Sequence, residues 1–190
     1  MIDVLFAQIL SLDRSLIEQA FYLHTPLLDE IMKIFTALWD FWAIWIVIIC
    51  LCLVIREYRL KALLLIEWMC INILLWEGLL KHLFHRARPF ESIDTIQLLV
   101  PSPLTTSFPS GHTSTSIAFA ILFSWLFWRQ NRFFVGIVWI LALGISFSRF
   151  YLQVHYPSDI LAGVLLGGVS AWAVMVLARY ILKKKDLIEQ

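Results

Sequence analysis

Five long apolar runs constrain the fold of this chain more than any other feature of its sequence. The runs are residues 34–55, 62–80, 111–128, 133–147 and 160–178. Each approaches the ~20 residues that an α-helix needs to cross a hydrocarbon layer of ~30 Å. Hydrophobic residues make up 61% of the chain and charged residues 15%, whereas a soluble domain has about 45–50% and about 25%. The sequence therefore predicts an all-α, polytopic membrane helix bundle with five transmembrane helices.

The N-terminal segment has a different pattern. Residues 1–24 mix apolar positions with four charged ones, among them Asp13 and Arg14. Four charges are too many for a spanning helix, and an amphipathic helix lying in the membrane interface fits better. We therefore predict a single domain over residues 1–190, with an interfacial helix at 1–24, a membrane bundle at 25–182 and a cytoplasmic tail at 183–190.

The basic residues are divided unequally between the two sides of the predicted bundle. Nine Lys and Arg residues fall on the side that holds the C-terminus, and six fall on the other side. Because basic residues favour cytoplasmic loops, we expect the C-terminus to lie in the cytoplasm. The polar clusters at residues 81–89, 110–112 and 148–159 are then expected on the opposite face of the membrane.

Composition and spacing argue against several classes of protein. The net charge is +1, and no basic tract of the kind that binds nucleic acid is present. Cys50, Cys52 and Cys70 fall inside apolar runs and are expected to be reduced packing residues. No acidic cluster could hold Mg²⁺, and the pair His82 and His85 lacks a third ligand for zinc. We therefore expect no metal and no other cofactor.

A compact polar cluster, residues 148–159, separates the last two apolar runs. Arg149 can hold an anion with a bidentate guanidinium, and His155 can attack or shuttle a proton near neutral pH. Asp159, four residues later, can orient the imidazole as a triad carboxylate does, and Pro157 suits the first turn of the next helix. The alternative is an interfacial histidine flanked by snorkelling charges.

A second cluster, residues 81–89, follows the second apolar run. Lys81 and Arg88 are seven residues apart, so about two helical turns place them on similar faces. Glu77 lies one turn before Lys81 and could pair with it. Two cations that face one pocket repel each other unless an anion lies between them. The alternative is a basic patch for lipid headgroups, although such patches are common on the cytoplasmic side and this cluster is predicted outside.

A third cluster, Ser110-Gly111-His112, opens the third apolar run. Ser110 is a favourable N-cap, and Gly111 lets a ligand approach the backbone. A helix N-terminus presents free N–H groups and the positive end of the helix dipole, which suit a phosphate. His112 would then stand beside that phosphate. The alternative is an ordinary helix cap followed by an interfacial histidine.

Taken together, the clusters supply the groups needed for phosphoryl transfer without a metal. They offer three cations, two histidines, one carboxylate and one helix N-terminus on a single predicted side. Positioning and charge neutralisation are the main demands of that reaction. The alternative from another class is a membrane transporter or lipid-binding protein that uses Glu67, Asn72 and Glu77 as a relay. Those three residues could equally be polar packing groups.

In order and spacing, the clusters resemble the three-part signature of the type 2 phosphatidic acid phosphatase (PAP2) family. The matching segments read Lys81-x6-Arg88-Pro89, Ser110-Gly111-His112 and Ser148-Arg149-x5-His155-x3-Asp159. The resemblance implies hydrolysis through a phosphohistidine. It implies His155 as the nucleophile, Asp159 as its charge partner and His112 as the acid that protonates the leaving oxygen. The implied phosphate clamp consists of Lys81, Arg88, Ser110, Gly111 and Arg149.

The resemblance extends to short bacterial members that act on membrane lipid phosphates. The segment Leu27-Leu28-Asp29-x-x-Met32 resembles the undecaprenyl pyrophosphatase subgroup, whereas Gly111 departs from the Asp that is frequent there. The expected substrates are undecaprenyl pyrophosphate or phosphatidylglycerol phosphate, with lipid A phosphates and phosphatidate as alternatives. The expected location is the bacterial cytoplasmic (inner) membrane, with the active site on the extracytoplasmic side.

Two further alternatives follow from the same resemblance. The phosphoryl group could pass to another lipid rather than to water, which would make the protein a lipid phosphotransferase. The fold also resembles haloperoxidases that bind vanadate, although a short membrane-embedded chain argues against oxidation chemistry. The sequence leaves the oligomeric state open.

Overall fold

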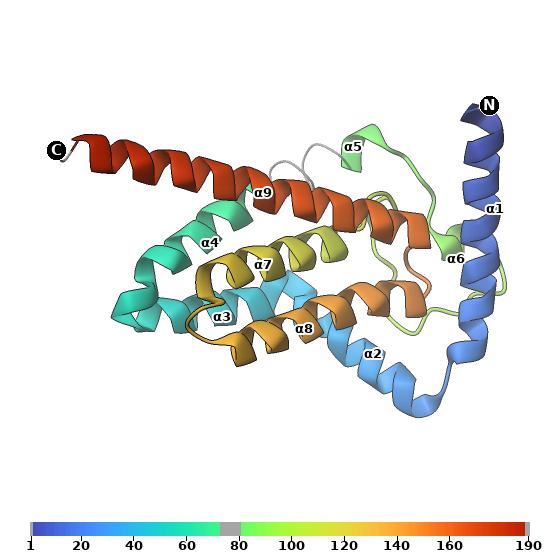
Figure 1. The fold of residues 1–190 in the computed structure, drawn as a ribbon. Coiled ribbons are helices and arrows are strands. Elements are labelled where there is room, and N and C mark those ends of the chain that lie inside the picture. The colour runs from blue at the N-terminus through green and yellow to red at the C-terminus, as the bar shows by residue number, and fades with distance from the viewer. Residues whose placement is uncertain (1, 73–80, 189–190) are drawn as a thin grey trace.

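The computed structural model describes residues 2–72 and 81–188 of the 190-residue chain. These residues form helices joined by turns and loops, and no strand occurs among them, in agreement with the predicted all-α fold (Figure 1). The helices are α1 (Ile2–Ala20), α2 (Pro26–Trp39), α3 (Ala43–Val54), α4 (Arg59–Asn72), α5 (Lys81–Leu83), α6 (Pro89–Ser92), α7 (Gly111–Phe127), α8 (Arg132–Tyr151) and α9 (Pro157–Ile188).

Helix α7 forms the centre of the bundle. It packs most extensively against α9 and α8, and it also contacts α4 (Figure 1). Its first turns consist of small polar residues that are fully buried, from Thr113 to Ser116, and its later turns bury large apolar side chains such as Phe119 and Phe123. Helices in a membrane associate with little hydrophobic driving force and depend on close packing instead. Small residues allow the neighbouring helices to approach α7 closely.

Within residues 2–72 and 81–188, two helices are long and apolar enough to span a membrane, namely α8 and residues 157–180 of α9. They correspond to the predicted runs 133–147 and 160–178, and both helices extend beyond those runs. Helix α7 matches the predicted run 111–128 closely. The run 62–80 is described only as far as the end of α4, and its remainder lies outside the described residues.

The first predicted span, residues 34–55, is not one straight helix. The structure divides it into α2 and α3, which are bent by 55° and joined by a 3-10 turn at Asp40–Trp42. Trp42 has a φ of 57°, in the left-handed region that interrupts an α-helix. Asp40 begins the turn and supplies a polar side chain at the break. If the bent pair acts as one span, the described residues contain three spans.

Helix α1 runs crosswise to the bundle, at the end where α9 begins and α8 finishes (Figure 1). Its buried residues, Asp13, Ile17 and Ala20, lie about one turn apart on a single face. Most of its other described side chains are exposed. This one-sided burial suits an amphipathic helix, and its location in the membrane interface stays a prediction.

The polar residues considered as a relay have separate surroundings. Glu67 is exposed, whereas Asn72 is buried and accepts a hydrogen bond of 3.0 Å from Thr115 Oγ1 on α7. Glu77 lies outside the described residues, as does its predicted pairing with Lys81. Asn72 therefore acts as a packing group between α4 and α7.

The cysteines agree only in part with the prediction that they pack in the core. All three are free thiols. Cys52 is buried in the main apolar cluster, whereas Cys50 and Cys70 are exposed on the outer faces of their helices. A helix in a membrane bundle has apolar residues on the face toward its neighbours and on the outer face. The position of a cysteine in an apolar run therefore does not predict whether its side chain is buried.

Gly163 and Gly167 form a GxxxG pair on α9, at the place where this helix packs closely against α7. A Cβ added at Gly163 would lie 2.8 Å from the backbone oxygen of Ser110, and one added at Gly167 would lie 2.5 Å from that of Ser114. Both oxygens belong to the beginning of α7. The absence of side chains at the two glycines therefore sets the distance between α9 and the α7 N-terminus.

We expect Gly167→Ala to lower the thermal stability of the protein, because overpacking against backbone costs about 1–3 kcal/mol. The matched control is Gly168→Ala, because no heavy atom lies within 4 Å of the added Cβ there. Melting temperatures in detergent, measured at one fixed scan rate, compare the two variants. Equal melting temperatures would contradict the packing argument.

Candidate active site

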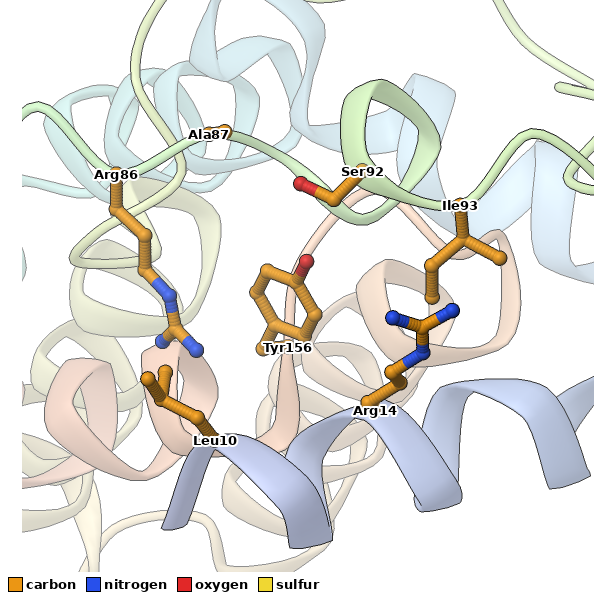
Figure 2. A pocket seen from close by; sticks show the side chains of 7 residues that line it. All are labelled: Leu10, Arg14, Arg86, Ala87, Ser92, Ile93 and Tyr156. Carbon is orange, nitrogen blue, oxygen red and sulfur yellow. The ribbon is translucent and has the colours of Figure 1, made fainter. Parts of the chain in front are cut away.

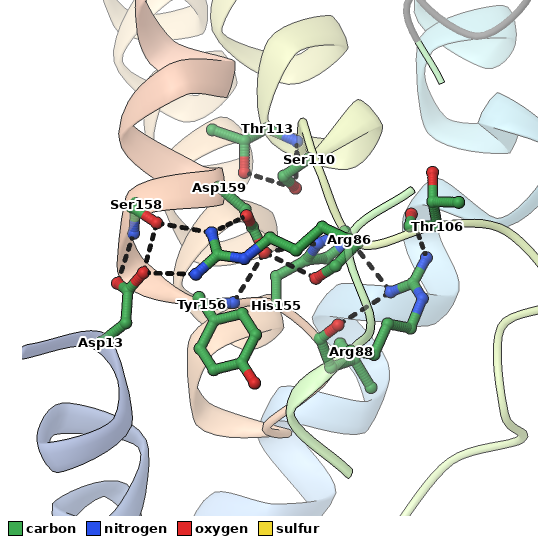
Figure 3. Close-up of polar contacts among 12 residues, drawn as sticks. Asp13, Arg86, Arg88, Thr106, Ser110, Thr113, His155, Tyr156, Ser158 and Asp159 are labelled. Atoms are coloured by element: carbon green, nitrogen blue, oxygen red, sulfur yellow. Dashed lines mark hydrogen bonds and ion pairs between the residues drawn. The ribbon is translucent and has the colours of Figure 1, made fainter. Parts of the chain in front are cut away.

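The three polar clusters meet at one end of the bundle, around the turn between α8 and α9 (Figure 3). The backbone N–H of Ser110 donates to the carbonyl of Asp159 at 3.1 Å, which joins the start of α7 to the start of α9. Arg88 Nη1 donates to the carbonyl of Val154 at 2.8 Å, which joins the segment after α5 to the same turn. The structure thus brings together residues that are far apart in the sequence.

Arg88 is the most firmly held cation of the site. Arg88 is 2% exposed, and its Nε donates to the carbonyl of Thr105 at 2.7 Å. Nη2 donates to Thr105 Oγ1 at 3.2 Å and to the Thr106 carbonyl at 3.3 Å. Nη1 also contacts Nε2 of His155 at 3.2 Å.

The contact with Arg88 determines which nitrogen of His155 carries the proton. A guanidinium has only donors, so Nε2 of His155 must accept and the neutral ring must be protonated at Nδ1. Burial, the largest cause, lowers the pKa of His155 to about 3, and the charges of Arg88 and Arg149 act in the same direction against Asp159. The imidazole is therefore neutral at physiological pH, with its Nε2 lone pair directed toward Arg88.

Asp159 lies on the other side of the His155 ring and is fully buried. Oδ1 forms an ion pair of 2.5 Å with Arg86, and Oδ2 accepts from Ser107 Oγ at 2.6 Å and from the Tyr156 N–H at 2.9 Å. His155 Nδ1 is 3.7 Å from Oδ2, which is longer than a hydrogen bond. Asp159 therefore acts on the ring as a nearby charge in this structure.

The start of α7 has the geometry that the sequence predicts. Ser110 is the N-cap, and its Oγ accepts from the Thr113 N–H at 3.4 Å. Gly111 follows as the first residue of the helix and is buried. The His112 ring stacks on Trp39 with centroids 3.6 Å apart, and its Nε2 is buried without a hydrogen-bond partner. An unpaired buried nitrogen of this kind is costly unless a ligand meets it.

A pocket of about 390 Å³ adjoins this end of α7. His112 and Arg149 line it together with part of α2 and with a proline-containing loop. Arg149 is 4% exposed and donates to Thr36 Oγ1 through Nη1, while its Nε has no partner. Lys81 belongs to the cluster at residues 81–89, where its Nζ donates to Thr105 Oγ1 at 3.1 Å.

Several residues of the site were given no role by the sequence. Arg86 pairs with Asp159 and with Asp13 of α1, and Trp39 covers His112. Arg86 could have been considered because it lies in the same basic cluster as Lys81. Asp13 could have been considered because it shares a helix face with apolar residues, where an unpaired carboxylate would be unfavourable.

Two carboxylates compete for Arg86. Burial alone would lower the pKa of its guanidinium, but the hydrogen bond to Asp13 and the charges of Asp159 and Asp13 outweigh burial and raise that pKa. Arg86 Nη1 also donates to Ser158 Oγ at 2.7 Å. Figure 3 shows this arginine between the two acidic side chains.

Metal-ligating side chains do not gather in the described part of the chain. Within residues 2–72 and 81–188, no three His, Cys, Asp or Glu residues are placed so that they could hold a metal ion. His85 is exposed, and the side chain of His82 lies outside the described part. The expectation of a reaction without a metal stays a prediction.

A comparison with family models identifies the family. Residues 61–183, which are more than half of the chain, match the model described as the PAP2 superfamily. The chain belongs to the PAP2 superfamily. The matched region contains all the residues of the three clusters, from Lys81 to Asp159.

Curated PAP2 relatives have several names. An undecaprenyl-diphosphatase from Sulfolobus acidocaldarius is 35% identical over 127 residues, which cover 65% of this chain and 58% of that protein. A lipid A 4′-phosphatase from Porphyromonas gingivalis is 27% identical over 167 residues, which cover 84% of this chain and 70% of that protein. The match thus spans little more than half the length of the first relative.

Two solved structures share the fold. A transmembrane PAP2 type phosphatidylglycerolphosphate phosphatase from Bacillus subtilis has a TM-score of 0.69 and 25% identity, covering 92% of this chain and 88% of that one. LpxE from Aquifex aeolicus has a TM-score of 0.71 and 25% identity, covering 88% and 94%. This PAP2 chain is therefore a membrane protein with the same helical architecture.

His155 should make the stability of the PAP2 domain depend on pH. Its pKa is about 6.5 in an unfolded chain and about 3 in the folded one, so between these values only the unfolded state binds the proton. The free energy of unfolding therefore falls as the pH drops below about 6.5, by up to ~1.4 kcal/mol per pH unit.

The measurement is the melting temperature in detergent between about pH 6.5 and 4.5. We expect His155→Gln to have a flatter pH dependence than the wild type over this range. His85→Gln, at an exposed histidine, is the control and should keep the wild-type slope. An unchanged slope in His155→Gln would mean that His155 is not buried in the neutral form.

Proposed function

We propose that this PAP2 protein is a metal-independent phosphatase that hydrolyses a phosphomonoester or pyrophosphate on a membrane lipid through a phosphohistidine. One observation carries the proposal. Nε2 of neutral His155 lies 3.2 Å from Nη1 of Arg88, so its lone pair is directed at the cation that would hold a phosphate. Nδ1 carries the proton and faces the carboxylate of Asp159. This is the tautomer that an attack through Nε2 requires.

The proposed first step breaks the bond between phosphorus and the leaving oxygen. The Nε2 lone pair of His155 forms a bond to phosphorus, and the electrons of the P–O bond move to the leaving oxygen. His112, protonated when the anionic phosphate lies beside it, acts as the general acid and gives that oxygen a proton. Water then attacks the phosphorus and gives a proton to His112, while the bond between phosphorus and Nε2 breaks and its electrons return to Nε2. This step releases inorganic phosphate and restores both histidines.

The remaining site residues neutralise and orient the phosphate. Arg88 and Arg149 are buried cations, and Lys81 joins the same region through Thr105. The Gly111 amide and Ser110, at the start of α7, add donors at the positive end of a helix dipole. Asp159 would stabilise the positive charge that the ring acquires after attack.

The proposed substrates are lipids with a phosphate or pyrophosphate head. Relatives named undecaprenyl-diphosphatase, lipid A 4′-phosphatase and phosphatidylglycerophosphatase B support this class. Undecaprenyl pyrophosphate and phosphatidylglycerol phosphate are the preferred candidates, with lipid A phosphates and phosphatidate next. We place the protein in the bacterial inner membrane, with the site on the extracytoplasmic side because fewer basic residues lie there.

The experiment that tests this proposal is phosphate release from a panel of lipid phosphates by the purified protein in detergent. We expect turnover of at least one lipid in the presence of EDTA, and we expect His155→Ala to abolish it because no other group supplies the nucleophile. Vanadate should inhibit, since its trigonal bipyramid resembles the phosphoryl transition state.

Controls separate the chemistry from folding in this assay. His85→Ala, at an exposed histidine outside the clamp, should retain wild-type turnover. A wild-type protein that releases no phosphate from any lipid of the panel would contradict the proposed function. Activity that EDTA removes and Mg²⁺ restores would contradict the metal-free mechanism.

The role of His112 can be tested with leaving groups of different stability. We expect His112→Ala to lose most of its activity toward lipid phosphates, where an alkoxide must be protonated. The variant should lose less activity toward aryl phosphates, because a phenolate leaves without being protonated. The loss toward lipid phosphates should be about 10²–10⁴-fold, the usual contribution of general acid catalysis. The measurement is kcat for both substrate types. An equal loss for the two would argue against the acid role.

A further inference from the structure

Among the described side chains of α1, the carboxylate of Asp13 is the one polar group that is buried. Asp13 is 3% exposed. Ile17, one turn later on the same face, belongs to a buried apolar cluster. A buried carboxylate is unfavourable unless donors surround it. Asp13 has three such donors, and all of them come from the active-site end of the bundle (Figure 3).

Two of the donors belong to the start of α9. The Ser158 N–H donates to Asp13 Oδ1 at 2.9 Å, and Ser158 Oγ donates to Oδ2. Ser158 is the second residue of α9, so its N–H has no partner within the helix. Asp13 therefore caps α9 from another part of the chain, and Ser158 precedes Asp159 directly.

The third donor is Arg86, which links Asp13 to Asp159. Nη2 of Arg86 contacts Asp13 Oδ2 at 2.6 Å, and Nη1 contacts Asp159 Oδ1 at 2.5 Å. The guanidinium also lies over the ring of Tyr156, 4.2 Å from its centroid. Figure 2 shows Arg86 beside Tyr156 at the edge of a pocket of about 230 Å³ that α1 helps to line.

A second contact holds α1 on the turn that carries His155. Gln153 Nε2 donates to the carbonyl of Ile17 at 2.9 Å. Gln153 is buried and has a φ of 54°, an uncommon conformation for a residue other than glycine. Helix α1 is thus attached to the active-site turn on both sides of His155, through Gln153 and through Ser158.

We propose that Asp13 is a positioning residue that holds Arg86 and thereby sets the net charge that Asp159 and Arg86 present to the His155 ring. The proposal rests on the function proposed above. Two carboxylates share one guanidinium, so the group of three carries a net charge of −1 beside the His155 ring. Without Asp13, Arg86 would neutralise Asp159 completely. The positive ring that forms on phosphorylation would then lose its stabilising charge, which is weakly screened in a buried site.

The test compares Asp13→Asn with Asp13→Ala on the best substrate of the lipid panel. Asn keeps the shape and an oxygen that accepts from Ser158, but it removes the charge. We expect both variants to lower kcat about tenfold with little change in KM, by analogy with the 10–100-fold lost when outer partners of metal-ligating histidines are removed. Glu18→Gln, at an exposed carboxylate on the same helix, is the matched control and should behave as wild type.

The double variant Asp13→Asn with Arg86→Gln identifies the route. If Asp13 acts through Arg86, the double variant loses no more kcat than Arg86→Gln alone. Additive losses would overturn the proposal, as would a wild-type kcat in Asp13→Asn accompanied by a loss in Asp13→Ala that follows the melting temperature. The latter result would assign Asp13 the role of a helix cap only.

A readout that does not depend on turnover separates this proposal from the proposed function. In protein labelled with ¹⁵N at histidine, the imidazole signals of His155 should shift in Asp13→Asn and stay unchanged in Glu18→Gln. Unchanged signals and unchanged kcat in Asp13→Asn, with an active wild type, would overturn the positioning role alone. An inactive wild type would overturn the proposed function and, with it, the catalytic meaning of Asp13.

Discussion

The close contact between α7 and α9 is the constraint on which the rest of the structure depends. Gly163 and Gly167 allow the backbone of α9 to approach the first turns of α7. At that distance the Ser110 N–H reaches the carbonyl of Asp159 at 3.1 Å. A larger residue at either glycine would separate the N-terminus of one helix from that of the other. Two helix N-termini therefore converge at the same place, where an anion is favoured.

This convergence explains how so many charged groups can be buried at the end of an apolar bundle. Arg88, Arg149 and Asp159 are each less than 5% exposed. Buried charges persist when they are paired and hydrogen-bonded, and here loop carbonyls satisfy Arg88 while Arg86 satisfies Asp159. Arg149 has fewer partners, since its Nε has none. It is therefore the cation that would gain most from an anion in the adjoining pocket.

Local patterns in the sequence predicted the parts of the site that depend on neighbouring residues. Ser110 as an N-cap and the start of α9 at Pro157 are encoded within a few positions. The break of the first span coincides with Asp40, the one charged residue of that apolar run. A single polar residue, however, does not predict a bend of 55° between two helices.

Contacts between distant segments could not be read in the same way. Asp13 and Arg86 are 73 residues apart, and so are Arg86 and Asp159. The sequence places Asp13 on an amphipathic helix but does not say which surface that helix covers. Likewise, no spacing pattern links Trp39 to His112, because the two stacked rings belong to helices that are far apart in the sequence.

The arrangement around His155 assigns different tasks to its two neighbours. Asp159 has both oxygens occupied by Arg86, Ser107 and Tyr156, so the carboxylate is fixed whether or not the ring bonds to it. In this structure Arg88 fixes the tautomer by occupying Nε2. During the proposed reaction Arg88 would turn to the phosphate, and the phosphorus would take its place at Nε2. The charge of Asp159 would then favour the proton on Nδ1, and for this reason it matters for turnover that Asp159 shares Arg86 with Asp13.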